Sequence, residues 1–589
     1  MSNTVKKNWK VLVIALVFMI GGSLLGAWIH TSAGNAKVED VLIRGTKGNV
    51  VSAYLYTPKT VNRKNPAPGI LAMHGGNNQK EFMDNTALEL ARRGYVVVSI
   101  DLAGHGYSQG AGVDTVATSM DGLLYLRSLP VVQKEKVGII GMSLGGTTAT
   151  GLGQLTKDYN AMFFMDSSCY VLPQCSALKN LGVSLGRSEE FPQRYAQTPT
   201  GREIPNSKLF RDLFGTKEAI KVGQLYGSIA DGTAHKLYQT NGTHASSTDD
   251  PRSIRNAIDW FELTLKGKTD TESDLVFPWK LFGTGIALFG ALLFVFPMGT
   301  LLLQTSYFKP LAEAVPQYKG FNGAGWWIGA LITTALGPIL YLWIWQGTFF
   351  GGKFIQPNRL WSQSINNIFM TWGIMVGIIT IILILLDHYA FTKRKGANAV
   401  NYGLTWEGNK IDWPKIGKSL LLAICILVPL YLICVFFNTV WQIDFRFWLL
   451  ALRPMSFPRF LTFLGYLIPY AVFFIPLAIA FHGFLRPQQG KASVGREMLI
   501  NSLVLTIGAL VWVLVFYIPL FSGYAPPGAA SAAGLAAIYY VPLLVLWPFV
   551  ACIMTYFFHK TGHMYVGAFV ATLFIVWYNA AYSQYVIGP

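Results

Sequence analysis

Long apolar runs fill the second half of the chain and limit what it can fold into. From residue 277 onward, eight runs of about 20 residues or more follow one another, near 281–303, 325–347, 367–388, 417–438, 460–482, 499–521, 535–558 and 564–586. A helix of about 20 apolar residues crosses the hydrocarbon core of a bilayer. Only 13% of the residues are charged, about half the share of an ordinary soluble chain. The sequence therefore predicts an all-α transmembrane bundle of about eight helices over 269–589.

One further apolar run lies at the amino terminus. Residues 11–29 follow Lys6, Lys7 and Lys10 and are long enough to span a bilayer. The run could be a secretory signal peptide, but no strong small-x-small cleavage site follows it directly. We therefore expect residues 1–37 to be an uncleaved transmembrane anchor.

Basic residues in the loops between the apolar runs predict the orientation. If the amino terminus is cytoplasmic, the loops 389–416 and 483–498 are also cytoplasmic, and they carry many Lys and Arg residues, as the positive-inside rule requires. Residues 38–268 are then extracytoplasmic, and the protein is a multi-pass protein of the cell membrane. This arrangement accounts for the net charge of +17, so we expect the lipid bilayer, and no nucleic acid, as a partner.

The stretch 440–457 does not fit the spanning pattern. It is apolar overall but contains Asp444, Arg446 and Arg453. Charged residues are costly in the middle of a bilayer. We expect this stretch to be interfacial or re-entrant.

Residues 38–268 differ in character, because short strands and amphipathic helices alternate there. Strands are expected at 38–45, 49–58, 67–73, 95–101 and 137–142, and helices at 81–94, 114–129 and 249–265. Continuous apolar strands such as YVVVSI are typical of parallel sheets that are buried on both faces. The order of these elements predicts an α/β domain with a mostly parallel sheet covered by helices on both sides.

The segment Gly141-Met142-Ser143-Leu144-Gly145 fits the pattern G-x-S-x-G between a buried strand and a small-residue helix start. The glycines permit a strained strand-to-helix turn that exposes the serine hydroxyl. Because the flanking strand and helix are the context that this motif needs, Ser143 is the candidate nucleophile.

Two further motifs precede this serine. Met73-His74-Gly75-Gly76 ends a strand, and residues 101–108 read DLAGHGYS. With Ser143, these motifs resemble in order the α/β-hydrolase superfamily, nearest to its dienelactone-hydrolase, esterase and serine-aminopeptidase types. Ala103 departs from the usual arginine of the D-x-R-G-H-G-x-S loop. The resemblance covers residues 38–268 and implies a serine hydrolase of the esterase, lipase or peptidase kind.

The resemblance also implies the order serine, acid, histidine along the chain. His244 is the candidate base, because it follows the strand HKLYQ and precedes the closing helix. His235 lies within that strand, where we expect a structural role.

The acid is less closely determined by the sequence. Gly186-Arg187-Ser188-Glu189 follows the strand at 180–186 and gives G-x-x-E where the family places its carboxylate, so Glu189 is preferred. Asp166, at the end of its strand, and Asp231, in an apparent hairpin turn, are the alternatives. If Glu189 is not catalytic, Glu189 and Glu190 are an ordinary pair of solvated acidic residues.

The oxyanion formed on the substrate needs backbone N–H donors. Leu144 follows the nucleophile directly and should supply one donor, and the loop at Gly76, or Asn77, should supply the other. The expected reaction is acyl transfer through Ser143 to water, on a small-molecule or lipid-like acyl substrate. No cofactor and no metal site are expected.

Two other functions remain open from the sequence. The bundle could belong to a transporter or an acyl-transfer membrane protein with an accessory hydrolase-fold domain, or the domain could be a non-catalytic binding module. Cys169 and Cys175 could form a disulfide if their domain is extracytoplasmic. The sequence does not indicate an oligomeric state.

Overall fold

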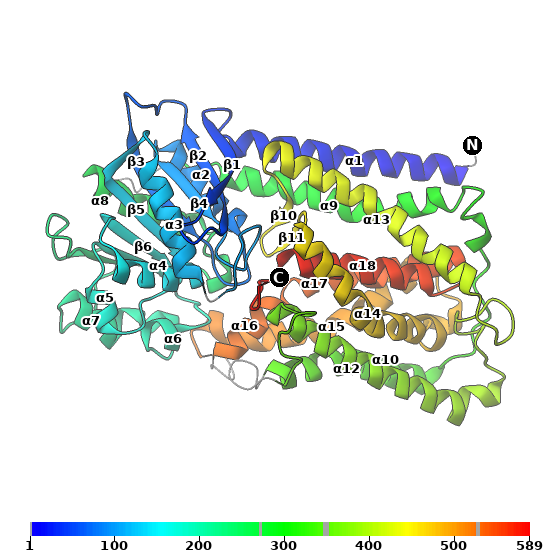
Figure 1. Ribbon diagram of the computed structural model, residues 1–589. Helices are drawn as coiled ribbons and strands as arrows, with labels where there is room; N and C mark the ends of the chain where they lie inside the picture. The colour runs from blue at the N-terminus through cyan, green and yellow to red at the C-terminus, as the bar shows by residue number, and fades with distance from the viewer. Residues whose placement is uncertain (1–2, 113, 270–273, 346–352, 526–530, 589) are drawn as a thin grey trace.

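A nine-stranded sheet and a set of long helices make up the two parts of the molecule (Figure 1). The computed structural model describes residues 3–112, 114–269, 274–345, 353–525 and 531–588, so the end of the predicted run 325–347 lies outside them. We call residues 36–267 the sheet domain and the remaining helices the bundle.

The central sheet has the strand order β1-β2-β4-β3-β5-β6-β7-β9-β8. The six strands from β4 to β9 in this order are parallel, whereas β1, β2 and β8 pair antiparallel at the edges. The strands are β1 (Ala36–Arg44), β2 (Val50–Pro58), β3 (Ala67–Met73), β4 (Val96–Ile100), β5 (Val132–Met142), β6 (Ala161–Met165), β7 (Leu181–Gly186), β8 (Leu225–Tyr226) and β9 (His235–Thr240). The strands β3, β4, β6 and β7 are buried along their whole length, as expected for strands covered on both faces.

Helices cover both faces of this sheet. Helices α2 (Asp84–Arg92) and α8 (Pro251–Lys266) pack on one face, and α3 (Thr115–Ser128) and α4 (Leu144–Leu155) pack on the other. Three short helices lie in the connections that follow β6 and β7, namely α5 (Leu172–Ser176), α6 (Pro192–Ala196) and α7 (Lys208–Phe214). The predicted α/β fold class with a mostly parallel sheet is confirmed.

The bundle contains the long apolar helices. Nine helices of the described residues are long and apolar enough to cross a membrane. They begin with α1 (Asn3–His30), α9 (Phe277–Leu302), α10 (Gly323–Trp345), α12 (Ser364–Asp387) and α13 (Trp413–Trp441), and continue with α14 (Phe457–Ile479), α15 (Val494–Ser522), α17 (Leu543–Thr561) and α18 (Tyr565–Tyr582). The predicted all-α bundle is therefore present beside the sheet domain.

The run 535–558 differs from its predicted form. It does not form one span, because the short helix α16 (Ser531–Tyr540) ends just before Pro542, and α17 starts after it. Proline lacks the backbone N–H that would continue a helix and disfavours helical geometry in the residue before it. The stretch 440–457 contains a β-hairpin, β10 (Phe445–Phe447) and β11 (Leu450–Leu452), and no spanning helix.

The first helix is part of the bundle and runs beside α9 over most of its length (Figure 1). Glycines allow this close approach. A side chain at Gly22 would collide with the backbone of α9 at Gly283, and one at Gly290 would crowd the backbone of α1 at Ala15. Small residues at helix contacts are typical of helix pairs in membranes.

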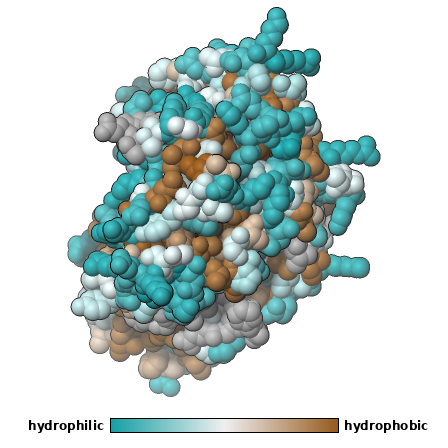
Figure 2. Space-filling view, turned by 90° about the vertical axis from the view of Figure 1, so that its left-hand side faces the viewer, coloured by the Kyte–Doolittle hydropathy of each residue, from teal (hydrophilic) through white to brown (hydrophobic). Residues whose placement is uncertain are grey.

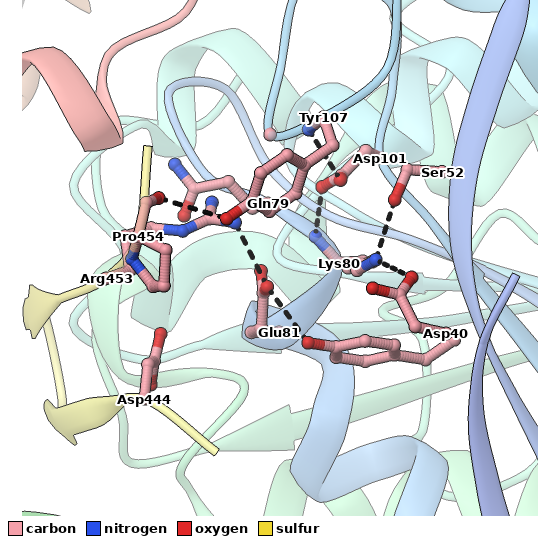
Figure 3. Close-up of polar contacts among 12 residues, drawn as sticks. Asp40, Ser52, Gln79, Lys80, Glu81, Asp101, Tyr107, Asp444, Arg453 and Pro454 are labelled. Atoms are coloured by element: carbon pink, nitrogen blue, oxygen red, sulfur yellow. Dashed lines mark hydrogen bonds and ion pairs between the residues drawn. The ribbon is translucent and has the colours of Figure 1, made fainter. Parts of the chain in front are cut away.

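A buried network of charges joins the sheet domain to the bundle (Figure 3). Arg453, just after the hairpin, donates to Glu81 at 3.1 Å, and Tyr107 donates to the carbonyl of Pro454 at 3.1 Å. Lys80 is paired with Asp40 within the sheet domain at 2.5 Å. Burial acts to raise the pKa of Glu81, but the charges of Arg453 and Lys80 lower it to about 2. The two parts are thus joined here by the buried ion pair Arg453–Glu81.

The last residues of the chain also lie at this junction (Figure 1). The backbone N–H of Tyr585 donates to the carbonyl of Gly104 and its carbonyl accepts from the N–H of Gly112, both in the loop between β4 and α3. Arg459 of α14 donates to the carbonyl of Gly106 in the same loop at 2.8 Å. The face of the sheet domain that points away from the bundle carries many hydrophilic residues, with hydrophobic ones between them (Figure 2).

Candidate active site

Ser143 lies on a sharp turn between β5 and α4. Its φ of 50° and ψ of −113° are strained for a residue with a side chain. A side chain at Gly141 would collide with the backbone of Gly145, and one at Gly145 would collide with the backbone of Met73. The G-x-S-x-G spacing is thus required by the close contact of the turn with its own helix and with β3.

His244 lies beside this serine. It follows β9 through a short loop, and its Nε2 lies 2.9 Å from Ser143 Oγ. Its backbone N–H donates to Glu190 Oε2 at 2.5 Å. The imidazole ring is packed between Phe191, at an interplanar angle of 87°, and Tyr195, at 6°. His244 is therefore fixed in orientation by contacts on both faces.

Glu189 lies on the other side of the imidazole ring. Its Oε1 is 3.0 Å from His244 Nδ1, and the side chain is fully buried. The same oxygen accepts the backbone N–H of Phe191 at 3.0 Å. With a proton on Nδ1 facing Glu189, His244 Nε2 is free to accept the proton of the Ser143 hydroxyl, which is the arrangement that a serine nucleophile needs.

The other acidic candidates make different contacts. Asp166 is buried at the end of β6, where it accepts the backbone N–H of Gly186 at 2.8 Å. Asp231 is exposed in a turn whose backbone bonds to Ser228, and the structure does not bring it to Ser143. Glu189 and Glu190 are both buried, so they are not a solvated acidic pair. His235 begins β9 and packs on Phe214, a structural position.

Three buried carboxyl groups thus lie around one histidine. Burial raises the pKa of Glu189 to about 7 and that of Glu190 to about 8. The pKa of Asp166 is raised well above its usual value, by burial first and then by the neighbouring charge of Glu189. Burial lowers the pKa of His244. Since like charges at close spacing disfavour one another's ionisation, the three groups do not all ionise together, and Glu189 is the one whose oxygen lies 3.0 Å from His244 Nδ1.

The two expected oxyanion donors lie next to each other. Leu144 begins α4, so its N–H is one of the donors at a helix start that have no partner within the helix. A side chain added at Gly76 would meet Leu144 at 3.8 Å, and one at Gly75 would meet Ser143 at 3.3 Å. Gly76 and Leu144 therefore lie close together beside Ser143.

Two residues at the site were not identified from the sequence. Tyr195 of α6 lies with its hydroxyl 3.3 Å from Ser143 Oγ. Gln584, near the end of the chain, accepts the backbone N–H of Asn77 at 3.2 Å through Oε1 and contacts His105 Nε2 at 2.7 Å. Neither residue belongs to a motif, so no local pattern could have indicated it. Gln584 fixes the loop that carries Gly76.

Cys169 and Cys175 form a disulfide with their Cα atoms 5.3 Å apart. The bridge closes the connection that includes α5, close to Tyr170, whose ring stacks on Tyr195 at an interplanar angle of 20°. It therefore braces the loop beside the site. Among the described residues, no group of three or more His, Cys, Asp and Glu side chains is arranged to hold a metal ion.

One family model matches part of the sheet domain. Residues 64–212 match the family model described as serine aminopeptidase, S33. The sheet and this match show an α/β-hydrolase fold, which here is joined to a bundle of apolar helices.

Solved structures with some likeness were also found. A bacterial heroin esterase is 16% identical, with 40% of this chain and 86% of that chain covered and a TM-score of 0.29. An esterase from Pyrococcus furiosus is 16% identical, with 39% and 94% covered and a TM-score of 0.29. A hypothetical protein from Pseudomonas aeruginosa is 22% identical, with a TM-score of 0.21, and the match covers 22% of this chain and only 43% of that protein. A search of curated proteins found no match.

Proposed function

We propose that this protein is a membrane-embedded serine hydrolase that cleaves an ester, thioester or amide through an acyl-enzyme at Ser143. The observation that carries the proposal is the line of three side chains, with Ser143 Oγ 2.9 Å from His244 Nε2 and His244 Nδ1 3.0 Å from Glu189. Both His244 and Glu189 are buried, and in a water-poor site such contacts are stronger than in solvent.

In the proposed reaction Ser143 Oγ attacks the carbonyl carbon while His244 Nε2 takes the hydroxyl proton. Glu189 stabilises the imidazolium that forms. The carbonyl oxygen becomes an oxyanion and accepts the N–H groups of Leu144 and Gly76. His244 then gives its proton to the leaving oxygen, sulfur or nitrogen, and the acyl group stays on Ser143. Water, activated by His244, adds to this ester and releases the acid and the free serine.

The location of the site supports an amphiphilic substrate. The cavity that holds Ser143 and His244 lies where the sheet domain meets the bundle and is lined by residues from both. A sheet domain outside the cell, with the amino terminus inside, agrees with the basic loops of the bundle. The Cys169–Cys175 disulfide also favours that side, because disulfides persist in oxidising compartments.

The test is covalent labelling of the purified full-length protein by a fluorophosphonate. Labelling of the wild type but not of Ser143→Ala supports the proposal. Ser364→Ala is the matched control, because Ser364 lines the same cavity and should label like wild type. A folded wild type that does not react would overturn the proposal, and vesicle transport that survives Ser143→Ala would favour the transporter.

The orientation has its own test. A protease site inserted beside Lys268, which is exposed, should be cut by protease added to intact cells. Protection in intact cells, with cleavage only after lysis, would reverse the proposed topology.

A further inference from the structure

The cavity at Ser143 extends out of the sheet domain into the bundle. It has a volume of about 300 Å³ and is lined on one side by Gly76, Ser143 and His244. The other side is lined by side chains of α12, α17 and α18 that are mostly apolar, such as Ile365, Leu543, Leu546 and Ile575, with Ser364, Tyr578, Asn579 and Tyr582 among them. We call this second side the apolar arm. Its apolar side chains suit a hydrocarbon chain.

The apolar arm has a definite depth and a closed end. Along α12 the lining runs from Ser364 to Trp372, which at 1.5 Å per residue is about 12 Å. The rings of Trp372, Phe473 and Trp547 close the far end, with centroids 5.1 Å to 5.9 Å apart. This depth approaches half of the apolar thickness of a bilayer, about 30 Å. An extended hydrocarbon segment of about 12 Å therefore fits between the site and the closed end of the arm.

We propose that the apolar arm binds one hydrocarbon chain of an amphiphilic substrate whose scissile carbonyl reaches Ser143. This inference rests on the proposed hydrolase function and names its substrate class, a single-chain lipid or a lipid-modified molecule. The volume of about 300 Å³ is at the lower end of ligand cavities, which span about 300 to 1,000 Å³. One chain can be accommodated, and a two-chain phospholipid cannot place both chains inside.

A second groove offers the route from the bilayer to this arm. It has a volume of about 720 Å³ and lies between α9, the hairpin β10–β11 and α17, with an entirely apolar lining. Phe447 and Val545 in this groove are 56% and 50% exposed, as lipid-facing side chains would be. Leu449 and Pro542 line both the groove and the cavity at Ser143. These two side chains therefore lie between the groove and the cavity at Ser143.

The tip of the hairpin also contacts the residue that follows the base. Trp448 Nε1 donates to the carbonyl of Ala245, the residue after His244, at 2.8 Å. Movement of the hairpin during chain entry would therefore displace the backbone next to His244. On the opposite side of the arm lies another cavity, of about 880 Å³, between α10, α12 and α14. The three aromatic rings at the closed end of the arm separate it from that cavity. The groove beside Leu449 is therefore the more open route into the arm.

The direct test is photo-crosslinking in lipid nanodiscs with full-length Ser143→Ala protein, which holds the substrate without cleaving it. The probe is a monoacylglycerol with a palmitoyl chain that carries a diazirine near its end. We expect adducts on the peptides that contain Leu543–Trp547 and Ile575–Tyr578. Adducts confined to the outer faces of the helices would overturn the chain site.

Two substitutions sharpen this test. Ile365→Trp fills the apolar arm and should lower these adducts at least fivefold, and Ile575→Phe is a second, smaller filling variant with the same expected direction. Ile382→Trp is the matched control on the same helix, because Ile382 is 49% exposed and away from the cavity, so it should label like the parent. Labelling that is insensitive to both filling variants would contradict the proposal.

The rate of crosslinking tests the entry route independently of the binding site. Val545→Trp partly fills the groove and should slow the approach to full crosslinking several-fold while the final extent stays the same. Val515→Trp, on the outer face of α15 and 47% exposed, is the control. An unchanged rate in Val545→Trp would exclude this route.

Failure of the chain site and failure of the hydrolase proposal give different results. If fluorophosphonate does not label Ser143 but the probe still labels the arm, the protein binds lipid chains without this chemistry. If fluorophosphonate labels Ser143 and the palmitoyl probe does not reach the arm, the hydrolase proposal stands and the chain site is wrong.

Discussion

Replacing Glu189 by glutamine distinguishes the three buried carboxyl groups around His244. Glu189 lies 3.0 Å from Nδ1, whereas Asp166 accepts the N–H of Gly186 and Glu190 accepts the N–H of His244. Glutamine keeps the size of the side chain but removes the charge that faces the imidazolium. Asp166→Asn keeps both functions of a protonated acid, because Oδ1 still accepts from Gly186 and the amide can still donate to Glu189.

The expected loss follows from the role of the charge. An amide in place of the acid of a serine triad lowers kcat about 10⁴-fold, or roughly 5.4 kcal/mol at 1.36 kcal/mol for each factor of ten. In Glu189→Gln the charge that raises the pKa of Asp166 and Glu190 is absent, so these groups ionise more readily and can replace part of the missing charge beside His244. We therefore expect Glu189→Gln to lower kcat about 10³-fold, roughly 4 kcal/mol, and Asp166→Asn to stay within about threefold.

The assay is hydrolysis of a short soluble p-nitrophenyl ester at pH 8 by the purified full-length protein. Active sites are counted with the fluorophosphonate, so that misfolded protein does not contribute. The reasoning would be refuted if Asp166→Asn lost about 10³-fold and Glu189→Gln stayed near wild type. Asp166 would then be the acid, and Glu189 would have a structural role.

Three further predictions concern pH, the junction and the end of the chain. kcat/KM should fall as the pH drops below about 7, because protonation of Glu189, with its pKa raised to about 7, removes the charge that His244 needs; a flat profile down to pH 5 would contradict this. Arg453→Met leaves Glu81 charged and buried at a cost of about 3–5 kcal/mol, so its Tm should fall far more than that of the control Arg359→Met, which changes an exposed arginine. The double variant Glu81→Gln/Arg453→Met should recover part of the lost Tm. Equal Tm values for the two single variants would exclude a stabilising ion pair. Gln584→Ala removes two polar contacts of about 0.5–1.5 kcal/mol each and should lower kcat about tenfold with little change in KM; a change in KM alone would indicate a role in binding.

Local sequence patterns were sufficient to predict the strands, the covering helices and the position of Ser143. Each depends on a short stretch, because periodicity determines the elements and the tight turn requires glycine at 141 and 145. The charges at Asp444 and Arg446 also indicated correctly that 440–457 does not span: the two side chains pair at 2.7 Å beside the hairpin. The spacing after β7 led to Glu189, which the structure places beside His244, although its role is still a prediction.

The contacts between distant segments could not be predicted in this way. Gln584 lies 507 positions after Asn77, the residue whose N–H it accepts, and Tyr517 of α15 donates to Glu190 at 3.0 Å across 327 positions. Such pairs depend on how the bundle docks on the sheet, and no pattern within either segment records that. The apolar arm could not be predicted either, because in the sequence its lining residues look like any other apolar positions of a helix.

Detection of the acyl-enzyme tests the central claim most directly. The full-length protein is mixed with a long-chain p-nitrophenyl ester, quenched in acid within the first turnover, digested and mapped by mass spectrometry. The account predicts the mass of the acyl chain on the peptide that contains Ser143, with stronger accumulation in a variant that slows deacylation, and none in Ser143→Ala. Release of p-nitrophenol without an adduct at Ser143, or with the adduct on another residue, would contradict it.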